Sequence, residues 1–180
     1  MTVLFKDELE FIKESNRIEG IYRAPTKAEK AEFRRFMSLD KITIADMKKF
    51  VSVYAGKEHV LRDKKGLDVR VGKYYPPEGS PDILVKLQKI LDTRNNFKTH
   101  VQYFLLNDGV KIKSAKPINE VAYKTHIAYE QLHPFTDGNG RSGRILWLWV
   151  MKAIRSSREI NSFLHQFYYQ TLQREQKQFW

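Results

Sequence analysis

The residues that could do chemistry are concentrated in one short stretch of the chain. Residues 133–144 read HPFTDGNGRSGR, which places an imidazole, a carboxylate, a Gly-Asn-Gly turn and two guanidinium groups close together. A general base, a metal ligand, a cradle of backbone amides and two cationic clamps are the parts that a nucleoside triphosphate site needs. The stretch therefore predicts a site that handles phosphate groups.

His133 and Asp137 are the candidates for base and metal ligand. His133 follows a predicted helix, where a neutral imidazole can accept a hydroxyl proton. Asp137 lies beside the glycines, and a carboxylate next to phosphate oxygens is a natural ligand of Mg²⁺. Taken alone, His133 fits a helix-end cap and Asp137 fits an ordinary turn, so both assignments depend on the rest of the stretch.

The second half of the stretch predicts an anion cradle. Residues 138–140 permit backbone conformations in which successive N–H groups converge on one anion. A helix expected over about residues 142–154 adds the positive end of its dipole. Arg141 and Arg144 lie in the first turn of this helix, where the dipole disfavours cations, so a bound anion is expected to compensate them. Alone, Gly-Asn-Gly is simply a turn.

The elements that must position residues 133–144 are predicted to be helices. Apolar residues recur at helical spacing, and the starts carry capping signals such as Thr26 with Glu29, Thr43 with Asp46, and Pro81 at a first helical position. Gly20 is a candidate for the residue just past a helix end. Helices are expected over about residues 3–19, from Thr26, from Thr43, from Pro81, and over about 118–132, 142–154 and 159–175.

One segment departs from the helical pattern. Residues 67–72 alternate like a short strand, and two consecutive prolines at 76 and 77 end the alternation. We interpret residues 67–79 as a small hairpin or flap. The predicted fold class is all-α with one small β-hairpin, and the helix after the glycines, apolar nearly all round, is expected to be central.

The amino-acid composition limits the classes of protein to which the chain can belong. The chain has 180 residues, 42% of them hydrophobic, and no cysteine, which fits one domain without disulfides or thiolate metal sites. A net charge of +11 favours anionic partners. The apolar run at 145–151 is too short to span a bilayer, so we expect a soluble, cytoplasmic protein.

The stretch 133–144 resembles the signature of the Fic family, His-x-Phe-x-Asp-Gly-Asn-Gly-Arg-x-x-Arg, at every fixed position. Residues 15–20 are similar to the family's inhibitory motif, residues 69–78 to its flap, and residues 161–169 to the helix that closes its core. The resemblance implies a single Fic domain over 1–180, with an inhibitory helix segment at 1–22, a flap at 67–79 and a catalytic helix-loop-helix at 118–156.

The resemblance also implies a reaction, namely transfer of AMP from ATP to a Ser, Thr or Tyr hydroxyl of a target protein with release of pyrophosphate. It implies ATP and Mg²⁺ as cofactors, His133 as the general base and Asp137 as the metal ligand. The implied phosphate-binding residues are Gly138, Asn139, Gly140, Arg141 and Arg144.

Two further roles are implied by the resemblance. Ser15 and Glu19 are spaced to share a helical face, and in the family such a glutamate pairs with the second arginine of the signature and disturbs γ-phosphate binding. Here the pair would be Glu19 with Arg144, which implies a self-inhibited class. Alone, Glu19 fits a solvated charge at a helix end. The flap is expected to dock the target by strand addition, with Val69, Val71 and Lys73 as the candidates.

Several alternatives stay open. On the same fold, phosphate or phosphocholine transfer and the removal of AMP are known family chemistries, although the intact Gly-Asn-Gly-Arg-x-x-Arg pattern favours AMP transfer. A basic nucleic-acid-binding module is the alternative of a different class, but the sequence carries no zinc spacing, Gly-rich RNA-binding signature or basic recognition helix. Self-modification and an oligomeric state are left open.

Overall fold

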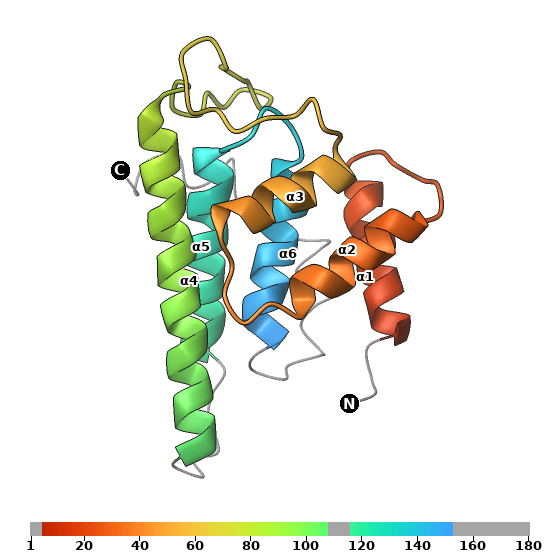
Figure 1. The fold of residues 1–180 in the computed structure, drawn as a ribbon, viewed down its shortest axis with the longest axis vertical. Helices are drawn as coiled ribbons and strands as arrows, with labels where there is room; N and C mark the ends of the chain where they lie inside the picture. The colour runs from red at the N-terminus through yellow and green to blue at the C-terminus, as the bar shows by residue number, and fades with distance from the viewer. Residues whose placement is uncertain (1–4, 108–115, 153–180) are drawn as a thin grey trace.

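The computed structural model describes residues 5–107 and 116–152, and every regular element within them is a helix. This confirms the predicted all-α fold class. The helices lie around one another with the N-terminal three on one side and the long α4 on the other (Figure 1). In chain order they are α1 (Phe5–Ile18), α2 (Lys27–Met37), α3 (Ile44–Tyr54), α4 (Pro81–Asn107), α5 (Lys116–Leu132) and α6 (Asn139–Lys152).

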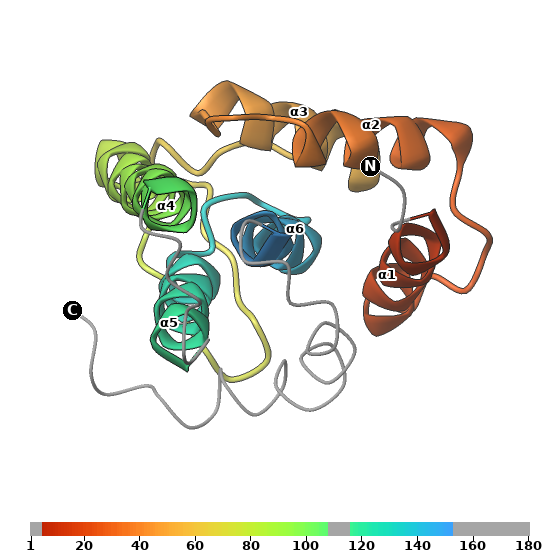
Figure 2. The same cartoon turned by 90° about the horizontal axis from the view of Figure 1, so that it is seen from below.

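Helix α6 is the centre of the fold. Seen from below, it is surrounded by the other helices (Figure 2), and it contacts each of them. Residues 141–151 of α6 are all buried, as expected for a helix that is apolar nearly all round. The helix begins at Asn139 rather than Ser142, because the Gly138 carbonyl already accepts a 3.0 Å bond from the Ser142 amide.

The starts of α2 and α3 carry the predicted capping boxes. The Thr26 hydroxyl accepts from the Glu29 amide at 3.1 Å, and the Glu29 carboxylate accepts from the Thr26 amide. Thr43 and Asp46 repeat this arrangement at α3. These reciprocal bonds satisfy amides that a helix start leaves without partners, and so they fix where both helices begin.

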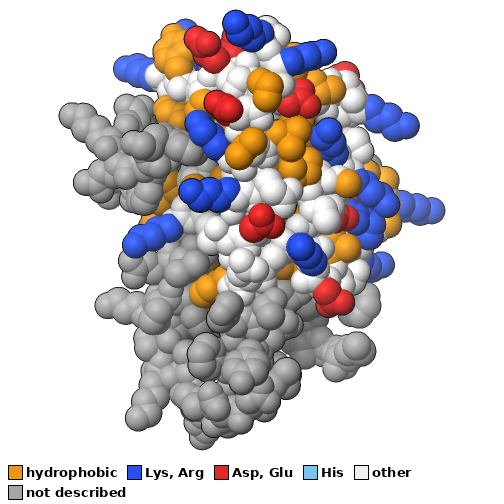
Figure 3. Space-filling view, turned by 60° about the vertical axis from the view of Figure 1, so that its left-hand side comes forward, with side chains coloured by type: hydrophobic (Ala, Val, Ile, Leu, Met, Phe, Trp, Pro, Cys, Tyr) orange, Lys and Arg blue, Asp and Glu red, His pale blue; other side chains and the backbone are white. Residues whose placement is uncertain are grey.

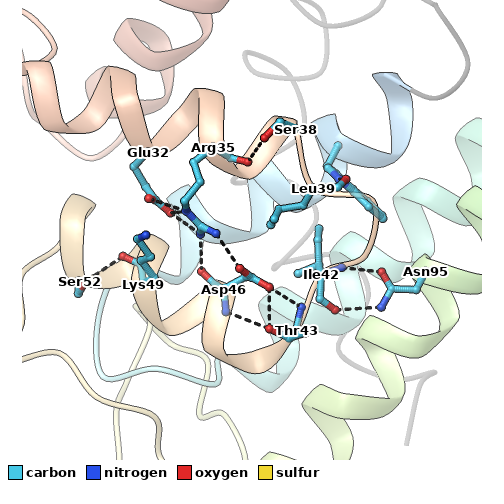
Figure 4. Close-up of polar contacts among 11 residues, drawn as sticks. Glu32, Arg35, Ser38, Leu39, Ile42, Thr43, Asp46, Lys49, Ser52 and Asn95 are labelled. Carbon is cyan, nitrogen blue, oxygen red and sulfur yellow. Dashed lines mark hydrogen bonds and ion pairs between the residues drawn. The ribbon is translucent and has the colours of Figure 1, made fainter.

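Polar contacts join α2, α3 and α4 (Figure 4). Arg35 on α2 bonds Glu32 on its own helix at 2.7 Å and Asp46 on α3 at 2.7 Å. Asn95 on α4 exchanges two 2.9 Å bonds with the backbone of Ile42. The first turn of α3 is thereby held to α2, and the loop before it is held to α4.

The N-terminal half of α4 buries Ile83, Leu87, Ile90 and Leu91, as its spacing predicts, but Leu84 is 38% exposed. The helical spacing also predicts a buried Leu84, and this prediction is wrong, because no described element covers the side of the helix that carries Leu84 and the exposed Val85. On the face that carries α4, Lys and Arg side chains alternate with acidic and apolar ones (Figure 3).

Residues 67–79 form no regular strand, which corrects the predicted alternation of residues 67–72 as a strand. Pairing is limited to an antiparallel bridge in which Val71 and Tyr74 exchange bonds of 3.0 and 2.9 Å. The Arg70 side chain donates to the Gly72 carbonyl at 2.6 Å, and the segment lacks a described neighbouring strand to extend the pairing. The hairpin is therefore a single tight turn.

None of the described helices is long and apolar enough to cross a membrane. The helix predicted over residues 159–175, the segment 161–169 and the last residues of the predicted helix-loop-helix lie outside the described residues.

Candidate active site

The loop between α5 and α6 begins with His133 in a left-handed backbone conformation, φ 48°. Its amide still donates to the Tyr129 carbonyl at 2.9 Å, so the residue closes α5 while turning the chain away from it. Its Nδ1 lies 3.3 Å from the backbone oxygen of Glu130. Because a carbonyl only accepts, Nδ1 carries the proton in this pairing, and Nε2 is left as the acceptor.

The imidazole of His133 is held in its neutral form. Burial lowers the pKa of His133 to about 4, and the neighbouring Arg62 charge acts in the same direction. The hydrogen bond to Glu130 and the charges of Asp137 and Glu19 oppose this shift. Near pH 7 the ring is therefore unprotonated and able to accept a proton.

Asn139 holds the loop closed from within. Its side-chain oxygen accepts from the Phe135 amide at 2.9 Å, and its side-chain nitrogen donates to the Phe135 carbonyl at 2.8 Å. Phe135 itself is fully buried, as expected for a residue that anchors the loop. The Asn139 side chain is thus engaged in the loop, which differs from its expected contact with phosphate, while its backbone amide belongs to the helix start that an anion can approach.

The glycine at 138 is required by both conformation and packing. Gly138 has φ 79°, and a Cβ there would lie 2.9 Å from the Cβ of Ala55 and 3.3 Å from Val51 at the end of α3. Its position before α6 leaves the first-turn amides of residues 139–141 without intrahelical partners, as at any helix start. These amides and the helix dipole make this end of α6 a place for anionic groups.

Asp137 is a carboxylate beside this helix start. Its side chain is 53% exposed, and one oxygen accepts from the Gly138 amide. The other lies 3.5 Å from Nε2 of His59, which also lies 3.3 Å from Glu58. Within the described residues no group of three or more His, Cys, Asp or Glu could hold a metal alone. One accessible carboxylate at an anion site still fits Mg²⁺, which takes its remaining ligands from phosphates and water.

Arg144 is joined to the N-terminal helix. Only 1% of its side chain is exposed, and it donates to the Glu19 carboxylate at 2.6 Å. It also donates to the hydroxyl and the carbonyl of Ser15, each at 2.9 Å. The expected pair of Glu19 with Arg144 is therefore present as a contact, and Ser15 shares it.

The direction of Glu19 follows from the way α1 ends. The Ile21 amide donates to Asn16 at 2.9 Å and the Gly20 amide to Arg17 at 3.0 Å. With Gly20 at φ 75°, these bonds form a Schellman motif, in which a glycine takes the left-handed position. The motif confirms the predicted role of Gly20 and fixes Glu19 at the helix end, where it faces α6.

Arg141 lies on the other side of the α6 start. It is 5% exposed, and its guanidinium donates to the Tyr54 carbonyl at the end of α3. Burial lowers the pKa of Arg141, and the nearby charges of Glu19 and Asp137 partly offset this. Arg141 and Arg144 therefore both lie near the start of α6, where Arg141 bonds the end of α3 and Arg144 bonds the end of α1.

Glu130 is a buried carboxylic acid beside this cluster. It is 3% exposed, and neither carboxylate oxygen has a hydrogen-bond partner among the described residues. A Cβ at Gly143 would lie 2.2 Å from its Oε1, so the glycine makes room for it. Burial raises the pKa of Glu130 to about 8, the charge of Arg144 lowers it, and that of Glu19 raises it.

We expect Glu130→Gln to flatten the pH dependence of stability between about pH 4.5 and pH 8. The pKa of Glu130 is raised from 4.5 to about 8 in the folded state, so its proton stabilises the fold fully below about 4.5, and this stability is lost as the pH rises through about 8. Calorimetry at both ends of the window is expected to show a fall in Tm for the natural chain and a smaller fall for the variant. Equal falls would exclude this role of the buried acid.

Residues 68–151 match the model of the Fic/DOC family. The Fic/DOC match includes the 67–79 turn almost completely, the whole 133–144 stretch and most of α6, and it leaves out the inhibitory motif at 15–20. It indicates AMP transfer or a related nucleotidyl transfer in general terms. A comparison with curated proteins found no match to the chain.

The structure brings most of the predicted site residues together around the start of α6. The flap candidates are less uniform: Val69 and Val71 are half-buried and Lys73 is exposed at the turn. Arg62, Glu130 and His59 were not singled out from the sequence. No local pattern distinguishes a buried arginine or glutamate from an exposed one, and both types are mostly exposed in proteins.

Proposed function

We propose that the protein transfers AMP from ATP to a Ser, Thr or Tyr hydroxyl of a target protein, and that Glu19 holds this activity back. The observation that carries the proposal is the ion pair of Glu19 with Arg144 at 2.6 Å, beside the loop that bears His133. The Fic/DOC match over residues 68–151 supports a transferase of this general kind.

His133 is the proposed general base. Its Nδ1 is engaged with the Glu130 carbonyl, so Nε2 takes the proton as the hydroxyl oxygen of the target attacks the α-phosphorus of ATP. The new bond joins that oxygen to phosphorus, the bond from phosphorus to the bridging oxygen breaks, and pyrophosphate leaves. Such a displacement depends on in-line positioning and on charge stabilisation.

The start of α6 is the proposed phosphate site. The backbone amides of residues 139–141 and the helix dipole face the phosphates, and Arg141 and Arg144 steady the outer ones. Asp137 is the proposed protein ligand of Mg²⁺, which neutralises phosphate charge when bound. Asn139 contributes by bonding both backbone groups of Phe135, which keeps the loop in shape.

Inhibition follows from the occupancy of Arg144. While its guanidinium donates to Glu19 and Ser15, it is not available to the γ-phosphate. ATP can then bind with its α-phosphate turned away from the line of attack, and small misplacements are costly for such a reaction.

Removal of AMP from a modified protein is a second candidate at the same site. The observation that favours it is that Glu19 is bonded to Arg144 on the helix that follows the His133 loop, and that its charge opposes the burial-driven fall in the pKa of His133. A carboxylate in this place could orient a water molecule toward a phosphorus atom. Loss of AMP from a modified target with the natural chain, but not with Glu19→Gly, would support this activity.

The proposal is tested by incubating the protein and a cell lysate with Mg²⁺ and ATP radiolabelled at the α-phosphate. Glu19→Gly is expected to label protein bands that the natural chain labels weakly, including its own band if self-modification occurs. The same protein with ATP labelled at the adenine ring is the matched control. No labelled protein with either nucleotide would contradict nucleotidyl transfer. We expect the setting to be the cytoplasm and leave the oligomeric state open.

We expect Asp137→Ala to lose most of the Mg²⁺-dependent part of ATP binding. The variant removes an accessible carboxylate beside the α6 start, so the ion would keep only phosphate and water ligands. Titration calorimetry with and without Mg²⁺ measures the effect, and Glu58→Ala, which removes a neighbouring exposed carboxylate, is the matched control. Unchanged Mg·ATP affinity in Asp137→Ala would exclude this residue as the metal ligand.

A further inference from the structure

Arg62 is a fully buried arginine whose side-chain hydrogen bonds, within the described part of the chain, all go to backbone oxygens. Its side chain is 0% exposed, and it donates to Leu132 at 2.9 Å, to His133 at 2.7 Å and to Pro77 at 2.9 Å. A longer bond of 3.4 Å reaches Leu67. Among the described residues no carboxylate lies within ion-pair distance of it. Burial of a guanidinium without a counter-charge is costly, so this arrangement needs a reason.

One end of the arrangement is the carboxyl end of α5. The last carbonyls of a helix have no intrahelical partner and carry the negative end of the dipole. Arg62 satisfies one of them, that of Leu132, together with the carbonyl of the following residue His133. It does so with a single planar group, a fork that lysine cannot reproduce. Its own backbone amide also donates to the Pro134 carbonyl at 2.8 Å. The carbonyls on both sides of the His133–Pro134 bond are therefore held by one residue.

These hydrogen bonds from Arg62 bear directly on the backbone conformation of His133. A non-glycine residue at φ 48° is strained and persists only where its surroundings impose it. The bonds from Arg62 to the carbonyls of His133 and Pro134 impose it here. Without them, the helix end would relax and the imidazole would point elsewhere.

The other end of the arrangement is the base of the 67–79 turn. Arg62 bonds the carbonyls of Leu67 and Pro77 on the two sides of the turn, and its own carbonyl accepts from Ser80 at 3.0 Å. A second tie runs from the Tyr74 hydroxyl to the Gln131 carbonyl at 2.7 Å. The turn is thus fastened to the same end of α5 that carries His133.

We propose that Arg62 is a positioning residue that fixes the backbone of His133 and couples it to the seating of the 67–79 turn. The inference rests on the proposed role of His133 as the base. It adds that the base is aimed correctly only when the turn, the expected docking element for the target, is seated on Arg62. Docking of the target protein on the 67–79 turn then also orients the His133 imidazole.

The test uses a second buried arginine as a matched control. Arg94 is 1% exposed and likewise donates to backbone oxygens, those of Leu146 and Ala122, each at 3.2 Å, away from the His133 loop. Arg62→Lys and Arg94→Lys are compared in the Glu19→Gly background. The measurements are kcat, the KM for ATP, and the NMR signals of the His133 ring and backbone.

We expect Arg62→Lys to lower kcat on the order of 100-fold, to leave the KM for ATP nearly unchanged and to move the His133 signals. Arg94→Lys is expected to leave the His133 signals in place even if it lowers Tm. If Arg62→Lys does not fold, Tyr74→Phe, which removes only the second tie, is expected to move the same signals less.

The inference is overturned if the His133 signals in Arg62→Lys or Tyr74→Phe match those of the natural chain, or if Arg94→Lys moves them equally. Undiminished kcat in Arg62→Lys would also overturn it. Absence of all transfer in Glu19→Gly is a different result, because it contradicts the proposed function while the His133 signals still report on positioning by Arg62.

Discussion

Glu19→Gly is expected to raise the rate of AMP transfer by about tenfold or more, since restoring an in-line geometry has effects of this size. In the natural chain Arg144 is 1% exposed and donates to the Glu19 carboxylate at 2.6 Å. Removing that carboxylate frees the guanidinium for the γ-phosphate and lets the α-phosphate take the productive pose. The measurement is the initial rate of protein labelling from α-labelled ATP at saturating Mg²⁺.

The controls for Glu19→Gly are chosen on the same helix. Glu10→Gly removes an exposed carboxylate of α1 that pairs with Lys13, and it is expected to leave the rate unchanged. Ser15→Ala removes the hydroxyl that accepts a bond from Arg144 and is expected to give a smaller gain. Adding Arg144→Ala to Glu19→Gly is expected to abolish the gain, because the clamp itself is then missing. A rate equal to that of Glu10→Gly would show that Glu19 is not inhibitory.

His133→Ala in the Glu19→Gly background is expected to lose AMP transfer by at least about a hundredfold, the lower range for removal of a general base. ATP affinity is expected to stay nearly unchanged, because the imidazole faces the target hydroxyl while the α6 start faces the phosphates. Transfer rates and titration calorimetry with Mg·ATP measure the two quantities separately.

Two results would speak against the assignment of His133. Comparable transfer by His133→Ala would exclude the imidazole as the base. A parallel loss of ATP affinity and transfer would instead indicate that the variant disturbs the loop, whose shape depends on the bonds between Asn139 and Phe135. Thermal unfolding of both proteins separates a local loss from a general one.

The parts of the fold that the sequence predicted are those with partners close along the chain. Thr26 and Glu29 lie three residues apart, and Gly20 ends the helix that it follows, so the bonds they make are local. The central place of α6 was also predictable, because a helix that is apolar on all sides must be buried on all sides. The hairpin at 67–79 was predicted, but the strand expected over residues 67–72 is absent, since strand pairing needs a partner that the described chain does not supply.

The sequence predicted which residues form the site, but it did not predict which contacts each side chain makes. The contact of Glu19 with Arg144 was expected through the family resemblance and is present. Asn139 was expected at the phosphates, yet its amide bonds Phe135, because the loop must satisfy the buried amide and carbonyl of that residue. Arg62 acts across 71 residues to reach His133, and no sequence pattern encodes such a contact.

The most direct test of the account is the mass and label of the product formed by Glu19→Gly. The purified variant is incubated with Mg²⁺, a lysate and ATP carrying one label at the α-phosphate and another at the γ-phosphate, and the modified protein is analysed by mass spectrometry. The account predicts a mass gain of one AMP, retention of the α-label and release of the γ-label in pyrophosphate. Retention of the γ-label with the gain of one phosphate would contradict it and show phosphate transfer on this fold instead.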